Sequence, residues 1–341
     1  MAFAFFPAST GVCALPSWER PRVLFPGDRA ATRWAGSGFF PAFRFSAQLY
    51  RTVLRLKAVA APGPRRVAEG ADSGLGDLVA DIWDDASAAA VLLGTPGPAQ
   101  KITAQLHDAS GRVVGYVKYG VSAQAQRLLR NEYDILQALP DIVGPRVRKI
   151  ADWQQGLALV TGTIGGRPVS VSLPPADMLV QFCERLHFDE AHPFGEHPWY
   201  DHAAGALQAT ESILAPLGNR SWPVAIQHGD LVPWNLRSSD GAYSAFDWEY
   251  ADLRSFPYLD LCYFIFQTAF LIHRWKPARA LEAVITFLCT HPRIALEPAE
   301  ARSIALLSTR DAYEKTRGDG HADDFPIQIW RRAILEVGGW H

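Results

Sequence analysis

Cysteine is scarce in this sequence, and the few cysteines are not spaced for metal binding. The 341 residues include four cysteines, at positions 13, 183, 262 and 289, and no two of them form a Cys-x-x-Cys pair. This pattern argues against a disulfide framework and against a thiolate metal site. We therefore interpret the four as reduced, mostly buried thiols of a cytoplasmic protein.

A membrane-spanning segment and an excess of basic charge are also missing. Pro7 and Pro16 interrupt the apolar N-terminal run, which lacks the basic start of a signal peptide. The sequence predicts no transmembrane helix. With 33 Lys and Arg against 35 Asp and Glu, the net charge is -2, so no overall positive field exists to bind nucleic acid.

What the sequence does contain is enough apolar residues for a substantial core. Hydrophobic residues make up 48% of the chain and aromatic residues 11%. A chain of this length and composition can offset its conformational entropy by burial, which excludes global disorder. We expect two domains, or one large domain with two lobes.

Basic charge is concentrated near the N-terminus, where the first 70 residues contain ten basic and three acidic residues. Apolar positions at helical spacing predict a helix over residues 41–59, and the Pro- and Gly-rich segment 61–76 is typical of a linker. Two interpretations of residues 39–57 stay open. We favour a helix packed on the next domain with its arginines in solvent over an interfacial helix on an anionic membrane.

Alternating and turn-bounded patterns predict a small sheet after the linker. Asp108-Ala-Ser-Gly111 is typical of a hairpin turn, and Ser122 is a typical N-cap for a helix that runs to about residue 139. The predicted strands cover residues 89–93, 101–107, 112–119, 147–152 and 157–161. The turn Gly165-Gly166 then leads into a mostly helical remainder.

One constellation of polar residues has the spacing of a phosphoryl-transfer site. Asp230 and Asn235 lie five residues apart on one predicted loop, and Asp247 ends a strand twelve residues further on. An amide oxygen and a carboxylate suit Mg²⁺, because nucleotide phosphates and water complete its coordination. Asn235 and Asp247 are therefore the candidate metal ligands, and Asp230 is the candidate base for an acceptor hydroxyl.

These residues lie in a recognisable motif. The segment His228-Gly-Asp-Leu-Val-Pro-Trp-Asn235, followed by Phe246-Asp-Trp-Glu249, resembles the Brenner motif of the aminoglycoside phosphotransferase and choline kinase family. His228 is a candidate catalytic residue, for which we favour a role in bracing the loop by hydrogen bonds over proton transfer. Glu249 is either a ligand of a second metal ion or a solvated or ion-paired carboxylate. Asp260, in Pro257-Tyr-Leu-Asp260-Leu, resembles the buried aspartate that holds this loop by hydrogen bonds.

A second, independent resemblance to this family lies upstream in the sequence. Lys118, in Tyr116-Val-Lys118-Tyr, resembles the lysine on the third strand of this family, and Glu132 resembles its partner on the following helix. The resemblance implies that the pair orients the α- and β-phosphates of a nucleotide. The turn at residues 94–100 departs from the usual pattern, because its two prolines leave fewer backbone N–H groups for phosphate.

The resemblance covers about residues 89–315 and implies an α+β, two-lobed, protein-kinase-like fold. We expect an N-terminal extension with its linker over residues 1–76, a small antiparallel-sheet N-lobe that binds nucleotide over 77–163, and a mainly helical C-lobe over 164–341. The C-lobe would hold the catalytic loop, the metal site and the acceptor site.

The implied activity is ATP- or GTP-dependent and Mg²⁺-dependent phosphorylation of a hydroxyl on a sugar, aminoglycoside or amino-alcohol. The alternative is a nucleotide-binding pseudokinase that serves as a scaffold in glycan assembly. A protein kinase is disfavoured, because no Ala-Pro-Glu segment follows Asp247. The histidine-rich segment 187–202 is interpreted either as an acceptor contact or as a polar surface loop, and its spacing disfavours zinc. We expect a cytoplasmic protein, with peripheral contact at the inner membrane face as the alternative.

Overall fold

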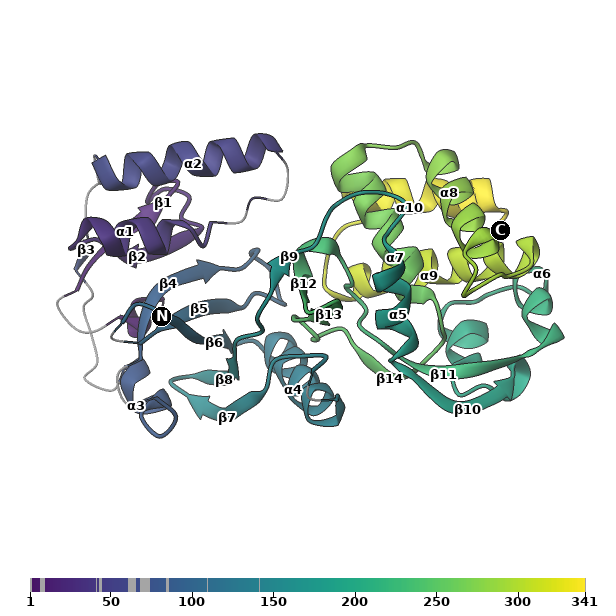
Figure 1. Ribbon diagram of the computed structural model, residues 1–341, viewed down its shortest axis with the longest axis horizontal. Helices are drawn as coiled ribbons and strands as arrows, with labels where there is room; N and C mark the ends of the chain where they lie inside the picture. The colour runs from purple at the N-terminus through teal and green to yellow at the C-terminus, as the bar shows by residue number, and fades with distance from the viewer. Residues whose placement is uncertain are drawn as a thin grey trace. The chain divides into compact units, whose positions relative to one another are not determined.

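The computed structural model describes residues 2–6, 10–40, 42, 45–60, 66–67, 74–83, 86–108, 110–140 and 142–340. The chain divides into two compact units, Met1–Gln137 with Pro145–Thr163 and Ala138–Gly144 with Ile164–His341. The first unit is built on an antiparallel sheet and the second is mainly helical (Figure 1). The predicted α+β fold class, with a small antiparallel-sheet unit and a mainly helical unit, is thereby confirmed.

One antiparallel sheet organises the N-terminal unit. Its strands pair in the order β3-β1-β2-β4-β5-β6-β8-β7. Their bounds are β1 Gly11–Leu15, β2 Val23–Pro26, β3 Arg66–Val67, β4 Ser87–Leu93, β5 Ile102–His107, β6 Val113–Gly120, β7 Val147–Trp153 and β8 Gly156–Gly162. The strands β4 to β8 lie where the sequence predicts them. The strands β1 and β2 were not predicted, and they add residues of the N-terminal extension to the same sheet.

Both faces of β1 and β2 are buried, which explains why these strands consist almost entirely of apolar residues. On one face, Cys13 and Phe25 pack with Leu54 and Ala58 of the helix α2, Phe45–Ala60. On the other face, Leu24 and its neighbours pack with the short elements η1 and α3. Both faces are buried, so successive side chains are all apolar. The helices of this unit are η1 Ala2–Phe5, α1 Ala30–Ser37, α2, α3 Leu75–Val79 and α4 Ala123–Ala138.

The helix predicted over residues 41–59 corresponds to α2. Positions 41 and 43–44, which include Phe43 and Arg44, lie outside the described residues, as do 61–65 and 68–73 of the predicted linker. The favoured packing of this helix on the domain is observed, because Leu54 and Ala58 are buried against Cys13, Phe25 and Ala90 of the sheet. Leu49, Val53 and Leu56 point to solvent, whereas Arg55 packs over the ring of Trp34. Arg55 therefore departs from the expectation that the arginines of this helix lie in solvent, because it contacts Trp34 of α1.

Helices around α9 form the core of the C-terminal unit. The helix α9 packs against α7, α8 and α10 (Figure 1). Pro277, Pro298 and Pro326 begin three of these helices, where a missing backbone N–H costs no intrahelical bond. The helices are α5 Asp177–Glu184, α6 Glu211–Leu214, α7 Leu259–Thr268, α8 Pro277–Thr290, α9 Pro298–Gly318 and α10 Pro326–Gly338.

Two small sheets complete this unit. One has the order β10-β11-β14 and the other β13-β12-β9. The strands are β9 Arg167–Pro168, β10 His187–Pro193, β11 Ser221–Gln227, β12 Leu236–Ser239, β13 Ala242–Ala245 and β14 Asp252–Ser255. The histidine-rich segment is therefore a strand over its first half, not a loop. Its polar composition fits β10, which is an edge strand with exposed side chains.

The cysteines and the helices agree with two expectations from the sequence. The four cysteines form no disulfide with one another, and Cys13, Cys183 and Cys262 are buried. Burial raises the pKa of the Cys183 thiol well above its ordinary value. Within the described part of the chain, no helix has the length and apolar character needed to span a bilayer.

Candidate functional site

In the N-terminal unit, Lys118 and Glu132 form the ion pair that the sequence predicts. Lys118 lies on β6, between β5 and β8, and Glu132 lies on α4. The Lys118 Nζ atom is 2.7 Å from both carboxylate oxygens of Glu132, whose side chain is 1% exposed. A buried pair of this kind is held in one geometry, because separating it would leave an uncompensated charge. The lysine ammonium is thus a fixed positive charge on this sheet.

The position of α4 is set at its first turn. Ser122 accepts a hydrogen bond from the backbone N–H of Ala125 at 3.0 Å, as its predicted N-cap role requires. The same hydroxyl donates to the carbonyl oxygen of Pro98 in the turn between β4 and β5. Leu129, one turn later, packs on Leu157 and Leu159 of β8. The helix that bears Glu132 is therefore fixed to both the turn and the sheet.

In the C-terminal unit, Asp260 holds the loop that follows β11. Its carboxylate accepts the backbone N–H groups of His228 at 2.6 Å and Gly229 at 3.0 Å. Gly229 has a φ of +77°, and a Cβ there would lie 2.3 Å from the Tyr250 carbonyl oxygen, so only glycine fits. Burial raises the pKa of Asp260 to about 6, although both backbone bonds oppose the shift.

His228 lies beneath this loop and is fully buried. Its Nδ1 accepts the backbone N–H of Asp230 at 3.2 Å, and its Nε2 is 3.1 Å from the carbonyl oxygen of Phe246. These partners require the proton on Nε2, because a carbonyl can only accept. Trp248 packs against the imidazole with ring centroids 4.5 Å apart. Both ring nitrogens are therefore used within the protein, which fits a bracing side chain.

The carboxylate of Asp230 is held at both oxygens. Tyr263 donates its hydroxyl to Oδ1 at 2.8 Å, and Asn235 donates its amide nitrogen to Oδ2 at 3.2 Å. Burial, followed by the negative charge of Asp247, raises the pKa of Asp230 to about 7, although the hydrogen bonds from Tyr263 and Asn235 oppose the shift. A carboxylate with this pKa can exchange a proton near neutral pH.

Asp247 and Glu249 follow β13 and present two further carboxylates. A carboxylate oxygen of Asp247 lies within 4.8 Å of one from Glu249. Asp247 has a φ of +74°, a conformation that aspartate and asparagine tolerate better than most residues. Because the Asn235 amide nitrogen faces Asp230, its amide oxygen points away from that carboxylate. The donor set of two carboxylates and one amide oxygen suits Mg²⁺.

Sequence reasoning missed Tyr263 and the groups that hold it. Tyr263 lies one turn after Asp260 on α7, so both side chains face the same loop. That spacing was the signal in the sequence that could have found it. Gln267, one further turn on, donates its amide nitrogen to the Tyr263 hydroxyl oxygen at 2.7 Å.

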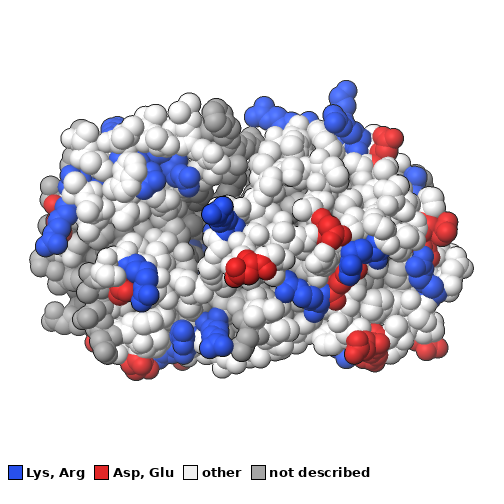
Figure 2. Space-filling model, in the orientation of Figure 1, with Lys and Arg blue, Asp and Glu red and all other residues white. Residues whose placement is uncertain are grey.

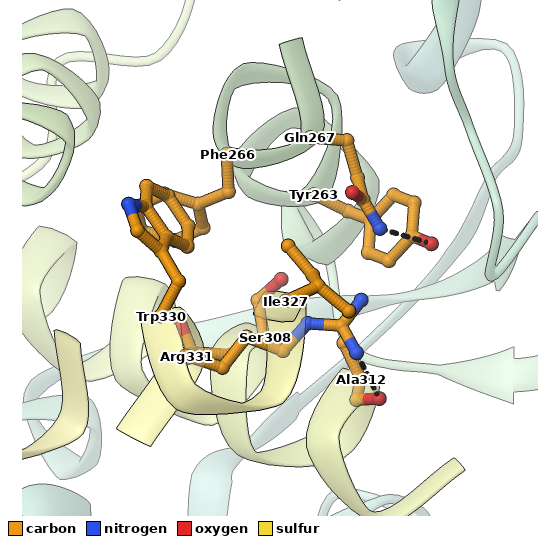
Figure 3. A pocket seen from close by; sticks show the side chains of 9 residues that line it. Tyr263, Phe266, Gln267, Ser308, Ala312, Ile327, Trp330 and Arg331 are labelled. Atoms are coloured by element: carbon orange, nitrogen blue, oxygen red, sulfur yellow. Dashed lines mark hydrogen bonds between the residues drawn. The ribbon is translucent and has the colours of Figure 1, made fainter. Parts of the chain in front are cut away.

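A small cavity lies beside Tyr263, between α7, α9 and α10 (Figure 3). Arg331 lines it from α10, and its guanidinium donates to the Ala312 carbonyl oxygen at 2.9 Å and to Gln328 at 3.0 Å. The centre of a water molecule can occupy only about 10 Å³ of this space. The cavity therefore has room for one water molecule at most, and not for an organic ligand.

The Lys118–Glu132 pair belongs to the N-terminal unit, and the loop that Asp260 holds belongs to the C-terminal unit. No family model matches the chain, and no curated protein does. Solved structures of aminoglycoside phosphotransferases, the family whose motifs the sequence resembles, are similar to it. A thermostable mutant of the enzyme APH(4)-Ia is 13% identical with a TM-score of 0.48, over 77% of this chain and 98% of that one.

Two further structures have lower TM-scores. The aminoglycoside phosphotransferase APH(3'')-Id from Streptomyces rimosus, in complex with ADP and streptomycin, is 22% identical with a TM-score of 0.42. That match covers 70% of this chain and 97% of that one. A putative fructosamine-3-kinase from Haemophilus somnus is 13% identical with a TM-score of 0.39, over 72% of this chain and 90% of that one.

Proposed function

We propose that this protein is a small-molecule kinase that transfers the γ-phosphoryl group of ATP or GTP to an acceptor hydroxyl. The observation that carries the proposal is the placement of Asp230. Its carboxylate is partly buried and held at both oxygens, on a loop that Asp260 fixes by two backbone hydrogen bonds. A carboxylate fixed in this way can orient an acceptor hydroxyl and take its proton.

The other site residues have complementary roles in this proposal. Asn235 and Asp247 would hold Mg²⁺, with Glu249 beside them, and Lys118 would contact the nucleotide phosphates while Glu132 fixes its position. Bound Mg²⁺ neutralises charge on the phosphates. Tyr263 is a positioning residue, because it acts on Asp230 and not on the substrate.

A nucleotide-consumption screen tests the proposal. The full chain is incubated with ATP or GTP and Mg²⁺ against panels of sugars, aminoglycosides and amino-alcohols, and nucleoside diphosphate is measured. We expect acceptor-dependent turnover with at least one panel, and we favour the sugars. Saturable nucleotide binding with no turnover on any panel would favour the pseudokinase scaffold, and absence of nucleotide binding would reject both functions.

Tyr263→Phe is expected to lower kcat by about tenfold, because a hydrogen bond to a charged carboxylate contributes about 1.5 kcal/mol or more. The KM for nucleotide should stay unchanged, since Tyr263 contacts Asp230 only through its hydroxyl. Steady-state kinetics with the acceptor found in the screen measures both constants. Tyr313→Phe is the matched control, because that hydroxyl donates to Asp323 instead. Equal losses of kcat in both variants would contradict the positioning role.

A further inference from the structure

The outward face of α2 is apolar. Leu49, Val53 and Leu56 follow the i, i+4, i+7 spacing of one helix face and are 60%, 54% and 57% exposed. Leu54 and Ala58 lie on the opposite face, where they are 6% and 5% exposed and pack on β1, β2 and β4. The helix therefore covers the sheet with one apolar face and presents a second to solvent.

This orientation is fixed by contacts on both sides of α2. The Arg55 guanidinium lies 3.9 Å from the centre of the Trp34 ring and donates to the Trp34 carbonyl oxygen at 3.0 Å. Arg33 of α1 donates to the carbonyl oxygen of Val59 at 3.1 Å. We call Leu49, Val53 and Leu56 the apolar stripe. With these bonds and the buried Leu54, α2 cannot turn this stripe inward without breaking the packing of α1. The exposed stripe is a stable feature of the surface.

The charge around the stripe is positive. The helix α2 contains Arg51, Arg55 and Lys57 and no acidic residue, and Lys57 is exposed beside the stripe. The first 70 residues hold ten basic residues against three acidic ones, in a chain whose net charge is -2. Figure 2 shows the surface over α2 as mainly uncharged, with Lys and Arg side chains in it. An anionic surface complements this charge.

The size of the stripe favours a lipid surface over a protein partner. A helix of 16 residues is about 24 Å long, so one face offers a few hundred Å². A stable interface with a second copy needs about 800 Å² from each partner. Binding to a bilayer needs no minimum contact area of this kind, because each aliphatic side chain can enter the boundary between headgroups and acyl chains by itself.

We propose that α2 adsorbs to anionic lipid membranes, with Leu49, Val53 and Leu56 inserted below the headgroups and Lys57 beside the lipid phosphates. The inference does not depend on the proposed kinase activity. It places the N-terminal unit, and therefore the whole chain, at a membrane surface without a spanning helix.

Vesicle co-sedimentation of the full chain tests this proposal. The vesicles are an equimolar mixture of phosphatidylcholine and phosphatidylglycerol, compared with phosphatidylcholine alone. We expect binding to the anionic vesicles that weakens as salt is raised, because screening removes the attraction of the cations. Equal binding to both vesicle types, or no binding to either, would overturn the proposal.

The decisive variant replaces Leu49, Val53 and Leu56 together with glutamine, which favours helix and is tolerated at exposed positions. Binding should fall at least about tenfold, since three apolar insertions are lost. Lys57→Gln should weaken it about fivefold. The matched control replaces three equally exposed aliphatic residues of the other unit, Ile142, Ile329 and Val337, with glutamine and should bind as the parent does.

Circular dichroism and sedimentation velocity complete the test. The triple variant should keep the helix content and thermal transition of the parent, because none of its three positions is buried. Vesicle binding by the triple variant equal to that of the parent would overturn the proposal. A parent chain that dimerises in solution, and loses both dimer and vesicle binding in the triple variant, would assign the stripe to a second copy instead.

Discussion

Asp230→Asn is expected to lower turnover by about two to four orders of magnitude, while the affinity for nucleotide stays nearly unchanged. Asparagine keeps the shape of the side chain and can still accept the Tyr263 hydroxyl. It cannot take the proton of an acceptor hydroxyl, which is the role that we propose for Asp230. The measurements are kcat with an acceptor from the screen and nucleotide affinity by calorimetry.

Asp240→Asn is the matched control for this experiment. Asp240 is exposed between β12 and β13 and has a φ of +50°, which asparagine tolerates. The control should keep the kcat and nucleotide affinity of the parent. Parental turnover in Asp230→Asn would show that the base is another group or that no base is needed.

Asp247→Ala is expected to abolish the Mg²⁺-dependent part of nucleotide binding. Removal of a metal-ligating carboxylate should weaken Mg²⁺-dependent affinity by at least about 100-fold. Titration of the nucleotide in the presence of Mg²⁺ and of a chelator separates this effect from binding that needs no metal. Lys118 would still contribute to the metal-independent part.

The backbone at position 247 calls for a second variant. Alanine is disfavoured at a φ of +74°, so Asp247→Ala could also destabilise the loop. Asp247→Asn removes the charge and keeps a residue that tolerates this conformation, and it should show the same loss of Mg²⁺ dependence. Asp252→Asn, at an exposed carboxylate, is the control. Unchanged Mg²⁺ dependence in Asp247→Asn would reject Asp247 as a ligand.

Recognisable motifs allowed the ion pair and the loop anchor to be predicted from the sequence. Lys118 and Glu132 lie on consecutive elements, a strand and the helix after it, and their 2.7 Å contact confirms the expected pairing. Asp260 accepts the loop N–H groups as the motif implies. In both cases the partners are close in sequence or belong to one motif, so few alternative arrangements exist.

Features that depend on distant partners could not be predicted. The strand β2 pairs with β4, about 70 residues later, and a run of four apolar residues does not identify that partner. The helix α2 has apolar residues on both faces, so its periodicity could not decide which face packs. The spacing of Tyr263 from Asp260 indicates that Tyr263 faces the loop, but its bond to Asp230 depends on how α7 lies against that loop.

The pairing of β2 with β4 also means that the N-terminal extension protects the sheet from self-association. Deleting residues 1–76 would leave the outer edge of β4 with unpaired N–H and C=O groups, a ready template for another strand. In the intact chain the sheet ends instead at β3, which spans two residues and carries the charged Arg66. A strand so short and charged is a poor template, so we expect the extension to keep the protein monodisperse as well as folded.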